Sequence, residues 1–111
     1  MTNKPSGGEV GLTERAARAL GGPLVGFHHG EPWLWTDMVP FDPLHNLNHA
    51  KLCTDEVERM GYLWETHLNA SGKYVTLWRL LGGRPGEVDG STQGATVCES
   101  WCRMLLAVKE K

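Results

Sequence analysis

Apolar residues near the carboxyl end of the chain recur with the period of a helix, at Val97, Trp101, Met104, Leu105 and Val108. Just before this stripe, Thr96 and Glu99 have the spacing of a capping box, in which a hydroxyl and a carboxylate each accept a free backbone N–H. The pattern therefore predicts an amphipathic helix that begins directly after Thr96.

Two earlier helices are predicted from their boundaries. Thr13 is a suitable N-cap for a helix that runs to Leu20, and the glycines and proline at 21–23 end it. Asp42-Pro43 is a suitable start for a second helix, which Gly61 ends. The apolar positions of this second helix are Leu44, Leu47, Cys53, Val57 and Met60.

Two runs in the middle of the chain, Tyr62–Leu68 and Lys73–Leu81, have the composition of strands, and the segment 69–72 between them is typical of a hairpin connection. Both faces of the second run are mostly apolar, which is typical of a sheet that helices cover on both sides. A further strand signal lies at 33–35, and the glycine-rich segment 82–95 is expected to be flexible.

These elements predict an α+β fold in which a small antiparallel sheet is sandwiched between helices, in α-β-α layers. The chain has 111 residues, of which 41% are apolar and 22% charged, enough for one globular domain and too little for two. Residues 1–11 are expected to form a flexible leader, and residues 12–111 the single domain.

The charge balance makes nucleic acid an improbable partner. The 11 basic and 13 acidic residues give a net charge of −2, whereas non-specific nucleic-acid binding needs a basic face. No apolar run reaches the roughly 18 residues of a membrane span, so no membrane association is expected. The polar first ten residues and three cysteines without disulfide spacing indicate a cytoplasmic protein with reduced thiols.

The spacing of the histidines and cysteines bears on metal binding and on catalysis. His45, His49 and Cys53 share one stripe of the second predicted helix, and Cys98 and Cys102 repeat its spacing on the last helix, so zinc could bind between adjacent helices. The alternative is that the cysteines are core residues and the histidines lie at a helix edge, which the absence of CxxC pairs favours. No metal site is therefore predicted, and without a catalytic motif we expect no enzyme activity and no cofactor.

The most unusual feature of the composition is its content of five tryptophans. Trp33 and Trp35 are two apart, so they point to the same side of an extended chain, and with nearby histidines (His28 and His29 among them) they could form a pocket for a planar ligand. Core packing of at least one indole is the favoured alternative, and for Arg79 the favoured alternative is a strand-end residue that reaches water. The ligand-binding residues predicted on this basis are Trp33, Trp35, His45, Asn46, His49, Arg79 and Arg84.

The order of several short motifs resembles a known family. They are Leu20-Gly21-Gly22, Trp33-Leu34-Trp35-Thr36-Asp37, Phe41-Asp42-Pro43, Val57-Glu58-Arg59-Met60, Trp78-Arg79, Ala95-Thr96 and the run from Trp101 to Leu106. Together, over roughly residues 12–108, they resemble the phage ABA-sandwich domain, a group of small phage and prophage proteins. The resemblance implies α-β-α layering and a phage or prophage origin, hence the cytoplasm of an infected or lysogenic bacterial cell, and it carries no shared activity.

The sequence is compatible with two functions. The first is a small non-enzymatic protein that sequesters a nucleotide-derived immune signal to counter host defence, as a homo-oligomer with sites between chains. The alternative is a protein-interaction inhibitor or adaptor that acts on a host or phage protein, whose mark would be an exposed apolar patch without a concave pocket.

Overall fold

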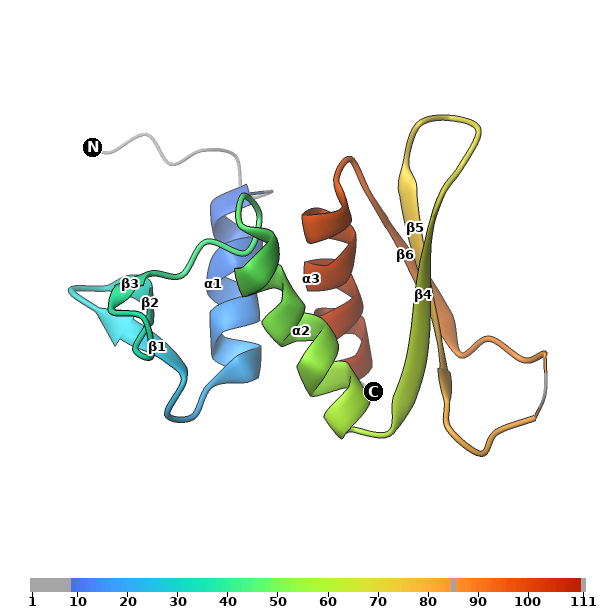
Figure 1. The fold of residues 1–111 in the computed structure, drawn as a ribbon, viewed down its shortest axis with the longest axis horizontal. Helices are drawn as coiled ribbons and strands as arrows, with labels where there is room; N and C mark the ends of the chain where they lie inside the picture. Colours follow the sequence, from blue (N-terminus) through green and yellow to red (C-terminus); the bar gives the residue numbers. More distant parts are fainter. Residues whose placement is uncertain (1–8, 85, 111) are drawn as a thin grey trace.

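Three helices and two three-stranded antiparallel sheets make up residues 9–84 and 86–110, which the computed structural model describes (Figure 1). In chain order the elements are α1 (Glu9–Leu20), β1 (Val25–His28), β2 (Glu31–Leu34), β3 (Val39–Pro40), α2 (Leu47–Arg59), β4 (Tyr62–Leu68), β5 (Tyr74–Leu80), β6 (Gly90–Gly94) and α3 (Val97–Lys109). The predicted single-domain α+β fold with a small antiparallel sheet is confirmed.

The helices lie between the two sheets (Figure 1). Helix α1 packs on β1 and β2, whereas α2 and α3 pack on one face of the sheet β4–β5–β6. The order of the layers thus differs from the expected α-β-α order, because no helix of the described residues covers the second face of β4–β5–β6. Thr76 and Trp78 on the helix side are 0% and 4% exposed, whereas Val75 and Leu77 on the other side are only partly buried. Their apolar character therefore does not require a second helical layer.

The hairpin of β4 and β5 forms where the alternation predicts it. Leu68 pairs with Tyr74, and the register continues to Tyr62 and Leu80 at the other end. The Asn69 side chain shapes the connection, because its Oδ1 atom accepts the backbone N–H groups of Ser71 at 3.0 Å and Lys73 at 2.9 Å. Both strands are therefore confirmed to within a residue of the predicted bounds.

A chain of hydroxyl groups joins α3 to the inner face of this sheet. The Thr76 hydroxyl lies 2.6 Å from that of Ser100 and 2.9 Å from that of Thr66. Thr66 also accepts the indole N–H of Trp101 at 2.8 Å, and the Thr92 hydroxyl donates to the Ser100 carbonyl at 3.1 Å. Because buried polar groups are costly unless they are paired, this network sets the register of the helix on the sheet.

Strand β6 lies within the segment that was expected to be flexible, so the prediction for residues 90–94 is wrong. It pairs with β5 from Trp78–Gly90 to Tyr74–Gly94. The missing side chain of Gly90 makes this possible, because a Cβ atom there would overlap the Trp78 indole. The glycine that looked like a sign of flexibility is therefore the contact surface for a tryptophan.

The helix boundaries differ from prediction at two of three starts. Helix α1 begins at Glu9, so Thr13 lies inside it, residues 9–11 belong to the helix rather than to a leader, and residues 1–8 lie outside the described residues. Helix α2 begins at Leu47 rather than after Asp42-Pro43, because the Asn46 side chain caps it. Helix α3 has the predicted Thr96 cap, and the Glu99 carboxylate accepts the N–H of Ala95 at 3.1 Å.

Candidate functional site

The seven residues predicted to bind a ligand lie in separate parts of the fold. Trp33 and Trp35 belong to the small sheet beside α1, and Arg79 lies on β5, on the opposite side of the helical layer (Figure 1). His45, Asn46 and His49 surround the start of α2, and Arg84 lies in the exposed loop after β5. The structure therefore does not gather these seven side chains around one pocket.

Trp33 and Trp35 do lie together, on the side of the small sheet that faces away from the core. Their ring centroids are 6.2 Å apart at an interplanar angle of 55°, and the His28 ring lies 4.7 Å from Trp33. A planar ligand held between two rings needs parallel planes about 7 Å apart, since each stacked contact takes about 3.5 Å. The two indoles instead fill this space themselves, and Trp35 is seated on Gly26, where a Cβ atom would lie 2.6 Å from its Nε1.

The polar residues at the start of α2 form its cap. The Asn46 side chain accepts the backbone N–H groups of Asn48 at 2.9 Å and His49 at 3.2 Å. His49 is 6% exposed, its Nδ1 atom accepts the N–H of Asp42 at 2.9 Å, and its ring stacks on Phe41. His45 Nδ1 lies 3.0 Å from the Asp42 carboxylate. These contacts hold the segment before α2 against the helix, which occupies the groups that were expected to meet a ligand.

The cysteines lie in or beside the helical core. Within residues 9–84 and 86–110, no three His, Cys, Asp or Glu side chains gather closely enough to hold a metal ion. Cys53 of α2 and Cys102 of α3 are both fully buried, and their mutual hydrogen bond and burial raise the pKa of the Cys53 thiol well above its usual range. Burial also raises the pKa of Cys98. Thiols with raised pKa values are poor nucleophiles at neutral pH.

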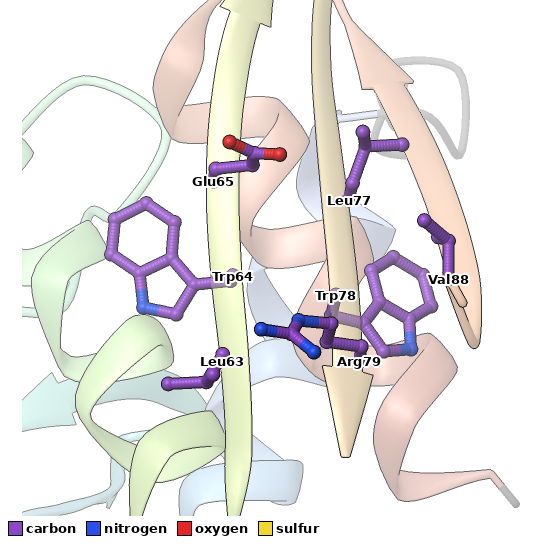
Figure 2. Close-up of a pocket in the computed structure, with 7 residues that line it drawn as sticks. All are labelled: Leu63, Trp64, Glu65, Leu77, Trp78, Arg79 and Val88. Carbon is purple, nitrogen blue, oxygen red and sulfur yellow. The ribbon is translucent and has the colours of Figure 1, made fainter. Parts of the chain in front are cut away.

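A different site lies on the uncovered side of β4–β5–β6, called here the outer face. The antiparallel register places side chains on it in pairs, Leu63 beside Arg79, Glu65 beside Leu77 and His67 beside Val75, with Ser91 and Gln93 on β6. A hollow of about 340 Å³ lies over this face and is lined by Leu63, Trp64, Glu65, Leu77, Trp78, Arg79 and Val88 (Figure 2).

Several apolar side chains at this hollow are open to solvent. Leu63 is 42% exposed and Val88 is 52% exposed, and Leu81, just beyond the end of β5, is 65% exposed. Leu77 lies on the middle strand β5, diagonal to Leu63, and is half-buried, and Arg79 lies between Leu63 and Val88 (Figure 2). Exposed aliphatic side chains that adjoin one another on a sheet face are a feature of surfaces that bind another molecule.

Two opposite charges flank the apolar centre of the outer face. The Glu65 carboxylate and the Arg79 guanidinium both lie over the space between β4 and β5 (Figure 2). Glu65 lies 3.3 Å from the His67 imidazole, and among the residues that the structure describes Arg79 has no ion-pair partner. The outer face therefore offers an apolar centre with one unpaired cation and one carboxylate that only a histidine approaches.

Arg79 is thus the predicted residue that reaches this site, and Leu63, Glu65, Leu77 and Val88 are the ones that the sequence reasoning missed. The signal was present, because the run Lys73–Leu81 is apolar on both faces. A run that is apolar on both faces predicts a second layer of helices, but in the structure no described residue covers this face.

No family model matches the chain, and no curated protein or solved structure is significantly similar to it. The resemblance to the phage ABA-sandwich domain therefore stays a prediction. Within the part of the chain that the structure describes, none of the helices has both the length and the apolar composition to cross a membrane.

Proposed function

We propose that this protein is a non-enzymatic protein-interaction module that binds a protein partner on the outer face of β4–β5–β6. The observation that carries the proposal is the combination of one covered and one uncovered face on the same sheet. The covered face contains buried Thr76 and Trp78, whereas Leu63 and Val88 on the uncovered side remain about half exposed. Burying such aliphatic side chains yields roughly 25 cal/mol for each Å² removed from water, so a complementary protein surface would be favoured there.

The charges on the outer face favour a protein over a nucleotide. A phosphate attracted to the Arg79 guanidinium would also meet the Glu65 carboxylate, which lines the same hollow and would repel it. A protein surface with an apolar centre and both an acidic and a basic group can satisfy the two charges at once. Sequestration of a nucleotide-derived signal stays a prediction from the sequence, and the alternative of an inhibitor or adaptor is the one that this geometry supports.

The proposal is tested by placing a charge in the centre of the outer face. Leu77→Asp is expected to reduce recovery of a protein partner, captured from lysate of a bacterial host and quantified by mass spectrometry, at least roughly tenfold. The matched control is Leu47→Asp, because Leu47 is 56% exposed on α2 and lies outside this face. Both variants should still unfold cooperatively in urea. Leu77→Asp is expected to lower the free energy of unfolding by about 1 kcal/mol, because Leu77 is half-buried and aspartate is disfavoured in strands, whereas Leu47→Asp should change it by less than about 0.5 kcal/mol.

Two results would count against the proposal. One is a captured protein that Leu77→Asp and Leu47→Asp retain equally, which would place the binding surface elsewhere. The other is a purified protein that carries a small molecule with nucleotide absorbance and captures no protein, which would favour sequestration.

A further inference from the structure

We infer that, in the absence of another protein, a second copy of this chain covers the outer face, so that the two β4–β5–β6 sheets pack face to face about a two-fold axis. This inference rests on the proposed docking role of that face and names its occupant.

The first argument is the shape of the outer face. Sheets pack face to face about 10 Å apart when aliphatic side chains from both interdigitate. Leu63, Leu77 and Val88 are the aliphatic side chains that line the hollow around Arg79, and the hollow beside Leu77 can receive an aliphatic side chain from a facing sheet (Figure 2). A second copy supplies a surface of the same size and composition.

The second argument is the charge pattern. A two-fold interface brings the same patch of both copies together, so it must be complementary to itself. An axis that runs parallel to the sheet, midway between Glu65 and Arg79 and perpendicular to the line that joins them, places the Arg79 of each copy opposite the Glu65 of the other. Both side chains line the same hollow from adjacent strands, and Arg79 has no other ion-pair partner among the described residues. The interface would therefore contain two symmetric ion pairs around an apolar centre.

The third argument is the surface area that two facing copies of the sheet would bury. Strands β4 and β5 have 7 residues each. With β6, which has 5 residues, the three strands span at most roughly 14 by 23 Å. With side-chain relief, two copies would bury up to about 1,000 Å² in total, near the lower bound for a specific interface. The expected complex is therefore a weak dimer, with a dissociation constant of roughly 1 to 100 µM.

Sedimentation velocity of the full chain tests this inference, at concentrations from about 1 to about 300 µM, which bracket the expected dissociation constant. Wild type should shift from monomer to dimer, Leu77→Asp should stay monomeric, and the control Leu47→Asp should dimerise like wild type. Arg79→Glu and Glu65→Arg should each weaken dimerisation roughly tenfold, because each places two like charges opposite one another. The double variant restores the opposite charges and should dimerise to within about threefold of wild type.

Three results would overturn the inference: a wild type that is monomeric throughout, a dimer that Leu77→Asp leaves intact, or a double variant no better than the single ones. The proposed function is judged separately by partner capture. A monomeric wild type whose captured partner still depends on Leu77 would refute the second copy as occupant and leave the docking role standing. A monomeric wild type whose partner capture does not depend on Leu77 would refute both the second copy as occupant and the docking role of the outer face.

Discussion

The two sheets have the same number of strands, and each packs one face on the helices. They differ in the side chains that lie on the face away from the helices. In the sheet β1–β2–β3 the outward side carries His28, Trp33 and Trp35, whose rings pack on one another. In the sheet β4–β5–β6 the large ring of Trp78 points inward, and aliphatic and charged side chains are left outside. The first sheet thus largely covers its outward side with its own aromatic rings, whereas the second leaves a surface that another molecule can cover.

A glycine opposite a tryptophan underlies this difference in both sheets. Gly26 lies under Trp35 on the outward side of the first sheet, and Gly90 lies under Trp78 on the inner side of the second. When a Cβ atom is added at Gly26, the outward ring of Trp35 can move into solvent, whereas the inward ring of Trp78 is held by the helices when a Cβ atom is added at Gly90. The same substitution should therefore have different costs in the two sheets.

The largest expected effect on the free energy of unfolding comes from adding a side chain at Gly90, under the buried Trp78 ring. Gly90→Ala should lower the free energy of unfolding by about 3 kcal/mol, because the added Cβ overlaps the buried Trp78 indole. Gly26→Ala should cost only about 1 kcal/mol, since Trp35 can tilt outward. Urea denaturation monitored by tryptophan fluorescence measures both, and Gly11→Ala in α1, where a Cβ meets no neighbour within 4 Å, is the neutral or stabilising control. Equal costs at Gly90 and Gly26 would refute the contrast between the two sheets.

A smaller effect is expected from the hydroxyl network that holds α3 on the inner face. Thr76→Val keeps the shape of the side chain and removes the hydrogen bonds to Thr66 and Ser100, which should cost about 2 kcal/mol. Val75→Thr, the reverse change one residue away on the outer face, should change the free energy of unfolding by less than about 0.5 kcal/mol. If both variants cost the same in urea denaturation, the two faces of β5 are not energetically distinct.

The smallest expected effect concerns the helical layer between the sheets. Hydrogen bonds from Arg59 and then Lys109 lower the pKa of Glu56 to about 2, and the Lys109 contact of 2.7 Å joins α3 to α2. Because this pKa is below its value of 4.5 in an unfolded chain, the stabilisation is complete above about pH 4.5 and is lost as the pH falls toward 2.

Glu56→Gln should therefore lower the free energy of unfolding by about 1 kcal/mol at pH 7, a modest value because solvent screens the exposed Arg59. The difference from wild type should shrink below pH 4.5 in denaturation curves measured across pH. A difference that stays constant down to pH 2 would show that the carboxylate does not provide this stabilisation.

Local signals were sufficient for the elements whose stability is local. The Thr96 cap with its apolar stripe identified α3, and the hairpin of β4 and β5 follows from alternation and a suitable turn. Strand β6 could not be predicted, because five residues of Gly, Ser, Thr and Gln carry no strand signal until Trp78 packs over Gly90. The start of α2 differs from the prediction because Asp42 and Asn46 are both good caps. In the fold, Asn46 caps the helix, and the contacts of His49 with Phe41 and with the Asp42 N–H hold the preceding segment in place.

For the site, the sequence by itself determined that β5 is apolar on both sides and that Arg79 belongs to one of them. Which side the helices cover was decided only by tertiary structure, through the buried contact of Thr76 with Ser100. The two residues that make this contact are 24 positions apart in the chain, and alternation along one strand contains no information about it. The sequence also could not show that Trp33 and Arg79 lie far apart. The helical layer that lies between them forms only when the whole chain folds.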